Sequence, residues 1–489
     1  MGYVASIDQG TTGTRFMVFD RSGTPVGNAY AKHEQIYPRH GWVEHDPDEI
    51  WERTKDVVLK GLDKAGIDGS ELEAIGVTNQ RETTVVWDED GTPLHNAVVW
   101  QDRRTTERVE ELFDEGRDDE IRAKTGLEPN SYFSATKLEW LLENEVDDTN
   151  RDEVLAGTVD SWLVYNLTDG EAHVTDTTNA SRTMLFDIHE LRWDDGLLDE
   201  FDVPRSILPD VRASTGEVYG HTSEEGFLGA SVPVAGALGD QQSALFGQTC
   251  FEAGDAKNTY GTGSFFLTNT GNEPVKSQHG LLTTVAFQRA GEPPCYALEG
   301  SVFMTGGVVE WLDEVGMIDG VEDCERVARE AGSSDGVYFV PAFTGLGAPY
   351  WDERASGTIV GMSRDTRSEH IVRAALESIA YQTRDVVEAM EDDSGVEIDA
   401  LRVDGGAVQN DLICELQASI VGTDIVRPVV DETTALGAAY TAGLTVGYWE
   451  SLDELRENRR IDRVFEGDGS DEDDYARWKK AVERARGWE

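Results

Sequence analysis

The chain has 489 residues, of which 39% are hydrophobic and 28% charged, and this length exceeds what one ordinary core accommodates. Its 95 aspartates and glutamates outnumber its 42 lysines and arginines, which gives a formal net charge of −53. The absence of a basic stripe argues against binding to nucleic acid or anionic lipid, and no apolar run reaches the ~20 residues that span a bilayer. We therefore expect a globular, multidomain protein without a targeting segment.

The acidic residues are spread along the whole chain, as in DEDGTP, ENEVDD and GDGSDEDD, rather than gathered in one tail. Such a coat repels itself in dilute buffer, where the Debye length is ~10 Å at 0.1 M, and is largely screened in molar salt. This pattern predicts the cytoplasm of an organism that accumulates salt. The four cysteines include no C-x-x-C pair and predict reduced thiols, as expected in that compartment.

The chain opens on a predicted hairpin, with strands over residues 3–7 and 16–19 joined through QGTTGTR. An ordinary turn is one interpretation, because glycine and threonine suit hairpins. A phosphate-binding loop is the other, because glycines let backbone N–H groups face an anion while hydroxyls and Arg15 add donors. Asp8, at the strand end, would then hold Mg²⁺ through water. This stretch alone leaves both interpretations open.

Farther along, Asp46-Pro47 predicts the start of an amphipathic helix. The stretch TNQRETTVVW then places Arg81 beside Glu82, either as a solvated surface pair or as donor and acceptor for the hydroxyls of a small polyol. Trp100 and Tyr132 would supply an apolar wall to such a site, or simply pack in the core.

A predicted strand over VPVAGALG leads into Asp240 and a helix. Asp240 is either the cap of that helix or a general base that takes a proton from an attacking alcohol. Residues 255–271 then repeat the first hairpin, with a second Gly-Thr-Gly turn. The repeat predicts one domain type used twice, with a boundary near residues 248–255.

The pattern SEHIVRAALESIAYQTRDVVEAM predicts a long amphipathic helix, and LRVDGGAVQND a strand, an Asp-Gly-Gly turn and a helix. Ligands collect beyond the carboxyl ends of strands in such α/β units, where Asp8, Asp240 and Asp404 are all expected. Gly405 and Gly406 would let the backbone approach a flat base. There is neither a G-x-x-x-x-G-K-[ST] motif nor a Rossmann G-x-G-x-x-G.

Together these motifs make the chain resemble the FGGY carbohydrate kinases, in order from about residue 3 to about residue 487. SIDQGTTGTR and RVDGGAVQND are shared broadly with sugar kinases of the actin-like ATPase superfamily. NQRETT, GWVEHDP, TNASRTM and FTGLGAPYWD are much more specific to members that phosphorylate glycerol.

The resemblance implies an α/β fold of two ribonuclease-H-like domains with a cleft between them. Residues 1–250 would carry the glycerol site and the first phosphate loop, and residues 251–489 the second phosphate loop and the adenosine site. The implied reaction is transfer of the γ-phosphoryl group of ATP, with Mg²⁺, to a terminal hydroxyl of glycerol, giving sn-glycerol 3-phosphate and ADP.

The resemblance also implies roles for individual residues. Asp240 would be the general base and Asp8 would act on the metal through water. The residues implied for glycerol are Arg81, Glu82, Trp100, Tyr132, Asp240, Gln241 and Phe265. The residues implied for the nucleotide are Thr11, Thr12, Gly13, Arg15, Gly261, Thr262, Gly263, Gly306, Glu310, Gly406 and Asn410.

Two departures stand out. Glu310 occupies a position where bacterial relatives commonly carry glutamine, and residues 220–231, GHTSEEGFLGAS, lack the Arg-bearing loop that binds fructose 1,6-bisphosphate in some of them. We expect no inhibition by that compound, and a homodimer or higher homo-oligomer. Two other functions stay open: an FGGY kinase for xylulose or erythritol, and a nucleotide-switched binding protein without a small-molecule acceptor.

Overall fold

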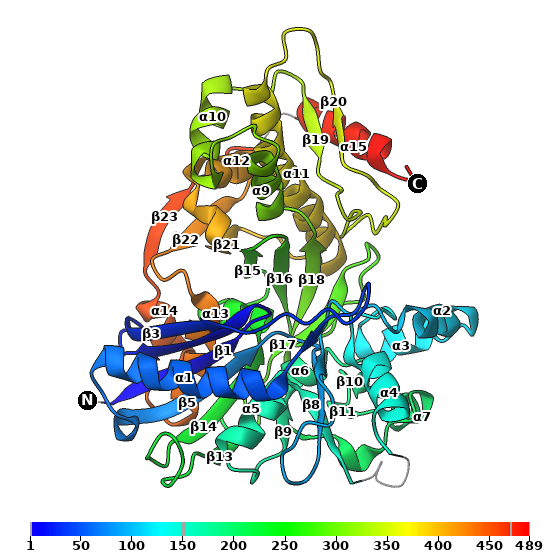
Figure 1. Ribbon diagram of the computed structural model, residues 1–489. Helices are drawn as coiled ribbons and strands as arrows, with labels where there is room; N and C mark the ends of the chain where they lie inside the picture. Colours follow the sequence, from blue (N-terminus) through cyan, green and yellow to red (C-terminus); the bar gives the residue numbers. More distant parts are fainter. Residues whose placement is uncertain (1, 148–152, 470–471, 489) are drawn as a thin grey trace.

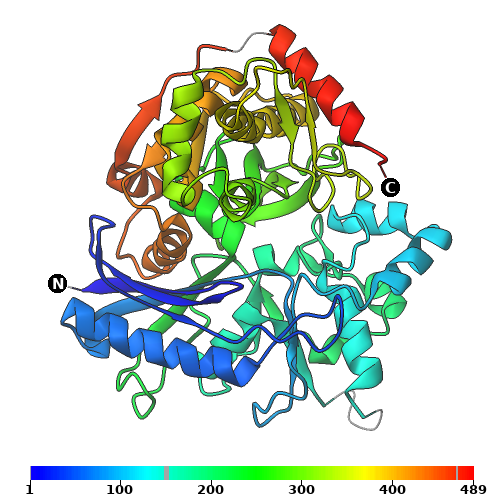
Figure 2. The ribbon, with the colours of Figure 1, turned by 45° about the horizontal axis from the view of Figure 1, so that its top comes forward.

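The computed structural model describes residues 2–147, 153–469 and 472–488, which form two stacked α/β units (Figure 1). The lower unit in Figure 1 contains a six-stranded sheet in the order β13-β14-β5-β1-β2-β3, and the upper unit a seven-stranded sheet in the order β17-β18-β16-β15-β21-β22-β23. Viewed with the top brought forward, the two units lie on opposite sides of the molecule (Figure 2).

The first sheet begins with the predicted hairpin, which is confirmed. Strands β1, β2 and β3 form an antiparallel meander, and β5 and β14 extend it in parallel from β1. Side chains alternate between the faces, so that Ile7 and Phe16 pack towards α1 whereas Val4 and Met17 pack on the opposite face. The strands are β1 (Tyr3–Gln9), β2 (Gly13–Phe19), β3 (Pro25–Lys32), β5 (Leu72–Asn79), β13 (Gly220–His221) and β14 (Pro233–Gly239).

The predicted start of the helix at Asp46 is confirmed in α1 (Pro47–Ala65). The Asp46 carboxylate accepts hydrogen bonds from the N–H groups of Asp48 and Glu49, and the helix ends at Gly66, whose φ of 71° is left-handed. The first half of the chain also contains a four-stranded sheet in the order β4-β7-β6-β8 and several short helices. These elements are β4 (Glu44–His45), β6 (Thr84–Trp87), β7 (Ala97–Val98), β8 (Leu155–Thr158), α2 (Thr106–Asp114), α3 (Asp118–Thr125), α4 (Ser134–Asn144), α5 (Val159–Leu167), α6 (Thr177–Ala180) and α7 (Asp195–Glu200).

The second sheet repeats the plan of the first, as the duplicated hairpin predicts. An antiparallel run of β15, β16 and β18 is extended in parallel from β15 by β21 and β22. The predicted long helix is α11 (Ser368–Ser394). The strands are β15 (Ala256–Tyr260), β16 (Ser264–Gly271), β17 (Leu282–Phe287), β18 (Cys295–Val302), β21 (Ala400–Gly405), β22 (Asp424–Pro428) and β23 (Ile461–Phe465). The remaining major helices are α9 (Gly306–Glu314), α10 (Cys324–Ala331), α12 (Asp411–Val421), α14 (Leu452–Asn458) and α15 (Glu472–Ala485).

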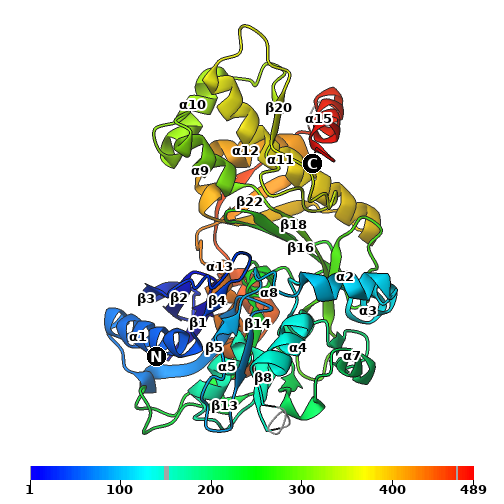
Figure 3. The same cartoon turned by 45° about the vertical axis from the view of Figure 1, so that its right-hand side comes forward.

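Two helices lie between the sheets, α8 (Asp240–Gly247) and α13 (Thr433–Thr445) (Figure 3). Helix α13 comes from the second half of the chain yet packs on β1, β5 and β14 of the first sheet, and α8 touches strands of both sheets. The two helices approach closely, since a Cβ on Gly437 would lie 1.9 Å from the carbonyl oxygen of Ser243. The position of α8, and of Asp240 at its start, therefore depends on α13.

Among the described helices, none combines the length and the hydrophobicity needed to cross a membrane. All four cysteines are free thiols, as predicted.

Candidate active site

The first Gly-Thr loop lies at the tip of the β1–β2 hairpin. Asp8 pairs in register with Arg15, and the N–H of Gly10 donates to the carbonyl oxygen of Gly13 at 2.9 Å, which makes the turn tight. The indole N–H of Trp100 donates to the Thr11 hydroxyl at 3.0 Å. Arg15 forms an ion pair with Glu432, directly before α13. The loop therefore contacts both the predicted acceptor wall and the second half of the chain.

A polar cluster of Gln35, His45 and Gln80, which the sequence did not predict, packs against this loop. The Gln35 amide donates to the carbonyl oxygen of Thr11 at 2.9 Å, and Gln35 Oε1 lies 3.0 Å from His45 Nε2. The Gln80 amide nitrogen lies 3.2 Å from His45 Nδ1. Nδ1 must therefore accept, so His45 is neutral. Burial, followed by the neighbouring His33, lowers the His45 pKa to about 3.

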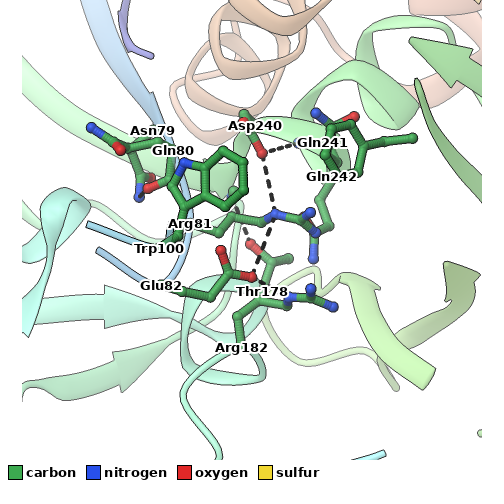
Figure 4. Close-up of polar contacts among 12 residues, drawn as sticks. Asn79, Gln80, Arg81, Glu82, Trp100, Thr178, Arg182, Asp240, Gln241 and Gln242 are labelled. Atoms are coloured by element: carbon green, nitrogen blue, oxygen red, sulfur yellow. Dashed lines mark hydrogen bonds and ion pairs between the residues drawn. The ribbon is translucent and has the colours of Figure 1, made fainter. Parts of the chain in front are cut away.

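Arg81 and Glu82 are only 3% and 1% exposed, which excludes the interpretation of a solvated surface pair. They lie in a network of four buried charges with two residues that sequence reasoning missed, Arg182 and Glu299, which are 0% and 1% exposed. The Nε of Arg182 donates to Glu82 Oε1 at 2.7 Å (Figure 4). Glu82 itself has a φ of 63°, a left-handed conformation that a non-glycine residue rarely adopts.

Asp240 lies directly above Arg81 in Figure 4. Its Oδ1 accepts from the N–H of Gln241 at 2.7 Å and lies 3.2 Å from Arg81 Nε. Gly239, not Asp240, is the cap residue of α8, so the capping interpretation does not hold. Burial raises the pKa of Asp240, and the positive charges of Arg81 and Lys257 oppose that shift.

Aromatic side chains border the same place. The rings of Trp100 and Tyr132 meet edge to face with centroids 5.4 Å apart, and both are half-buried, as is Phe265. The turn that carries Tyr132 is held by Lys137, whose buried ammonium donates to the carbonyl oxygens of Tyr132 at 2.7 Å and Phe133 at 3.1 Å. The plain core interpretation of Trp100 and Tyr132 therefore gives way to a partly open wall.

Lys257, on β15, is a further residue that the sequence reasoning missed. It is 0% exposed, and its ammonium donates to Gln241 Oε1 and to the Thr259 hydroxyl at 2.9 Å. Burial lowers its pKa to about 8, against the opposing effect of Asp404 and Asp240. Lysine within a predicted strand of mixed polarity carries no signal that would have marked it as buried.

The second Gly-Thr loop and the start of α9 form one unit. The N–H groups of Thr305 and Gly307 donate to the carbonyl oxygen of Thr262 at 2.8 and 2.9 Å, and the N–H of Gly306 donates to that of Gly261 at 3.1 Å. The predicted loop residues Gly261 and Thr262 are thus joined to the segment that contains Gly306. Glu310 lies one turn farther along α9 and is exposed.

The Asp-Gly-Gly turn differs from the expectation at two residues, Asp404 and Gly405. Gly405 has a φ of 93° and a Cβ there would lie 2.2 Å from the carbonyl oxygen of Tyr260, so the chain itself requires this glycine. Around Gly406, by contrast, a Cβ would meet nothing within 4 Å. Asp404 is 2% exposed and accepts from Thr433 and Gln248, so it braces α8 and α13 rather than facing a ligand. Asn410 caps α12.

Comparisons with known proteins agree with this arrangement. Residues 3–247 match the N-terminal domain, and residues 256–446 the C-terminal domain, of the FGGY family of carbohydrate kinases. The chain is 65% identical to a glycerol kinase of Haloferax volcanii and 63% identical to one of Halobacterium salinarum, covering 99% of this chain and 98% of each relative. These haloarchaeal relatives support the salt-adapted source predicted from the acidic composition.

Solved structures give the same result for the fold. A glycerol kinase of Plasmodium falciparum with ADP superposes with a TM-score of 0.94 at 39% identity, covering 99% of this chain and 98% of that one. A xylulose kinase of Lactobacillus acidophilus superposes with a TM-score of 0.87 at 23% identity, covering 99% and 97%. The predicted fold class is thereby confirmed.

Proposed function

Because this chain belongs to the FGGY family of carbohydrate kinases, we propose that the site around Arg81 and Asp240 phosphorylates glycerol at the expense of ATP. The single observation that carries this proposal is that Arg81 and Glu82, both buried, lie next to a half-buried wall formed by Trp100 and Tyr132. The product is sn-glycerol 3-phosphate, with ADP released.

The hydrogen-bonding capacity left at Arg81 and Glu82 suits a small polyol. A guanidinium has five N–H groups; within the described chain Gln242 and Glu299 accept from three of those on Arg81, and the Nε lies 3.2 Å from Asp240 Oδ1 in an ion pair. One N–H on Nη2 is left for a substrate hydroxyl. Glu82 uses Oε1 for Arg182, so Oε2 is left to accept from a neighbouring hydroxyl. Gln241 and Phe265 would complete the contacts with glycerol.

Asp240 serves as the general base in this proposal. Its side chain is 29% exposed, so one end of the carboxylate remains accessible to a hydroxyl group. Its raised pKa makes it a better proton acceptor than an ordinary aspartate. As the terminal hydroxyl of glycerol attacks the γ-phosphorus, its proton passes to Asp240, and the bond between the γ-phosphorus and the leaving oxygen of ADP breaks.

The two Gly-Thr loops would hold the phosphates. Thr11, Thr12, Gly13 and Arg15 offer hydroxyl, backbone and guanidinium donors on one side, and Thr262 with its flanking glycines offers hydroxyl and backbone donors on the other. For Arg15 this requires exchanging Glu432 for a phosphate oxygen. Gly306, Glu310, Gly406 and Asn410 would face the rest of the nucleotide, and the open space beside Gly406 is compatible with a base there.

The residues present also fit a Mg²⁺ ion that accompanies ATP. Burial raises the Asp8 pKa to about 7, Arg15 opposes this shift and Asp240 adds to it, so two acidic side chains act on each other at this site. Oxygen ligands of this kind suit Mg²⁺, which Asp8 would hold through water and which would neutralise phosphate charge.

The reduced cysteines and the use of ATP support a cytoplasmic location. We also retain the expectation that the protein forms a homodimer or a higher homo-oligomer.

The test is an ADP-release assay in multimolar KCl with Mg-ATP and glycerol, xylulose, erythritol or no acceptor. A rate that appears with glycerol and stays near background with the others supports the proposal. A rate only with another polyol overturns the substrate assignment but keeps the chemistry. An acceptor-independent rate favours the nucleotide-switched binding protein instead.

A further inference from the structure

Glu299 is the residue through which the second sheet reaches the acceptor site of the first. It lies on β18, is 1% exposed, and accepts from both terminal nitrogens of Arg81, with Oε1 lying 3.0 Å from Nη2. The same Oε1 accepts from Arg182 Nη2 at 3.1 Å. One carboxylate thus binds two buried guanidiniums that belong to the first half of the chain.

The contact continues from Arg182 to Glu82. Arg182 is 0% exposed and donates from Nε to Glu82 Oε1 at 2.7 Å. Its Nη1 has no hydrogen-bond partner within the described chain, so Glu82 and Glu299 provide the hydrogen bonds that orient the guanidinium, which also lies over the Phe133 ring at 5.3 Å. Glu299 therefore holds Arg81 directly and Glu82 indirectly, and these two residues are the proposed ligands of the substrate hydroxyls.

Two other carboxylates lie close enough to Arg81 to attract it if the charge of Glu299 were removed. Arg81 Nε lies 3.2 Å from Asp240 Oδ1 and 3.9 Å from Glu82 Oε1. A buried guanidinium released by Glu299 would turn towards these two carboxylates, because an unpaired buried charge is unfavourable. Both carboxylate groups are needed elsewhere, Glu82 for the substrate and Asp240 for the proton.

We propose that Glu299 is a positioning residue for the acceptor, which sets the orientation of Arg81 and Glu82 and so makes the glycerol site depend on docking of the second sheet. This inference rests on the proposed function, because it concerns how glycerol is held. It assigns Glu299 no contact with glycerol or ATP.

The test uses the full chain in multimolar KCl and compares wild type with Glu299→Gln, which keeps the shape but removes the charge. We expect the KM for glycerol to rise at least tenfold, while the KM for ATP stays within threefold of wild type. Glu299→Asp, which keeps the charge on a shorter side chain, should fall between the two. If the wild-type protein shows no glycerol-dependent ADP release, the proposed function itself is contradicted, independently of Glu299.

Asp385 provides a matched control. It is a carboxylate 2% exposed on α11, with Tyr475, Trp478 and Lys479 as partners on α15, at 2.8, 2.8 and 2.7 Å. Asp385→Asn should lower the unfolding midpoint without a selective change in the KM for glycerol. If Glu299→Gln behaves in the same way, Glu299 has only a structural role and the inference is wrong.

A second variant covers the case in which Glu299→Gln does not fold. Arg182→Lys keeps a positive charge but cannot contact Glu82 and Glu299 together through a fork of nitrogens. We expect the same selective rise in the KM for glycerol. An unchanged KM for glycerol in both Glu299→Asp and Arg182→Lys would overturn the inference.

Discussion

Among single residues, Asp240, at the start of a helix between the two sheets, combines two properties that suit a general base: partial exposure and a raised pKa. Asp240→Asn keeps the hydrogen bond from Gln241 but cannot take a proton. We expect turnover to fall by roughly 10²–10⁴ with the fold intact, as is usual for loss of general-base catalysis. Steady-state kinetics together with a denaturation curve measures both quantities, and activity within tenfold of wild type would contradict the role.

His45 makes the support beneath the first phosphate loop sensitive to acid. Its pKa of about 3 in the folded protein, against 6.5 ordinarily, means that below pH 6.5 the unfolded chain binds a proton that the folded chain does not. Stability is fully present above about pH 6.5 and is lost as the pH falls; at about pH 5 the loss amounts to ~2 kcal/mol.

The variant His45→Gln retains a donor and an acceptor but does not titrate. Chemical denaturation of both proteins at two pH values isolates the effect. The free energy of unfolding of wild type should fall by about 2 kcal/mol more than that of the variant between about pH 7.5 and pH 5. Equal losses in the two proteins would show that His45 does not carry this sensitivity.

Which site residues could be predicted from sequence depended on whether they lie in a motif. Arg81, Glu82 and Asp240 stand beside turns, where charged residues suggest chemistry. Glu299 and Lys257 lie inside strands. The buried partners of Glu299 are Arg81 and Arg182, which lie more than a hundred residues earlier in the sequence. Arg182 does lie within the quoted TNASRTM motif, but spacing alone did not identify its partner.

At the scale of elements, the packing of α8 against α13 decides where Asp240 lies. Gly437→Ala would place a Cβ 1.9 Å from the Ser243 carbonyl oxygen, which must move. We expect a loss of about 1–3 kcal/mol in the free energy of unfolding, despite the better helix propensity of alanine, because overpacking of a rigid backbone outweighs it. Turnover should also fall, since α8 shifts with Ser243.

Gly196 offers the control for this substitution. It lies in helix α7, and a Cβ there would meet no backbone atom but only two side-chain ends, Asp194 Oδ1 and Lys124 Nζ, both at 3.2 Å. Gly196→Ala should be neutral or stabilise by up to about 1 kcal/mol. If denaturation curves show the same change for both variants, close packing at Gly437 does not explain the loss.

The elements themselves were largely readable from the sequence. Both hairpins, the start of α1 at Asp46, the strand before Asp240 and the long helix α11 follow from local periodicity and turn chemistry. The packing of α13 on the first sheet could not be predicted from the sequence, because an apolar helix could pack on either sheet. Only tertiary contacts select β1, β5 and β14 as its partners.

For the whole molecule, the net charge of −53 dominates behaviour in solution. Repulsion among surface carboxylates should make the protein least stable in dilute buffer and more stable as KCl shortens the Debye length from ~10 Å at 0.1 M to ~3 Å at 1 M. The unfolding temperature measured across a KCl series checks this. A parallel series with a non-ionic osmolyte separates the screening of surface charge from stabilisation by exclusion of the solute from the protein surface. Equal unfolding temperatures at low and multimolar KCl would contradict the expectation.

The place of α13 between the sheets has a consequence for how the protein is made. When Cys250 has been synthesised, all six strands of the first sheet exist, but the helix that covers Val4 and Met17 on one face is almost two hundred residues away in the sequence. That face stays without its cover until residues 433–445 have left the ribosome. The first half of the chain therefore finishes folding only after α13 has been synthesised, and a polypeptide that stops before α13 exposes an apolar surface suited to chaperone capture.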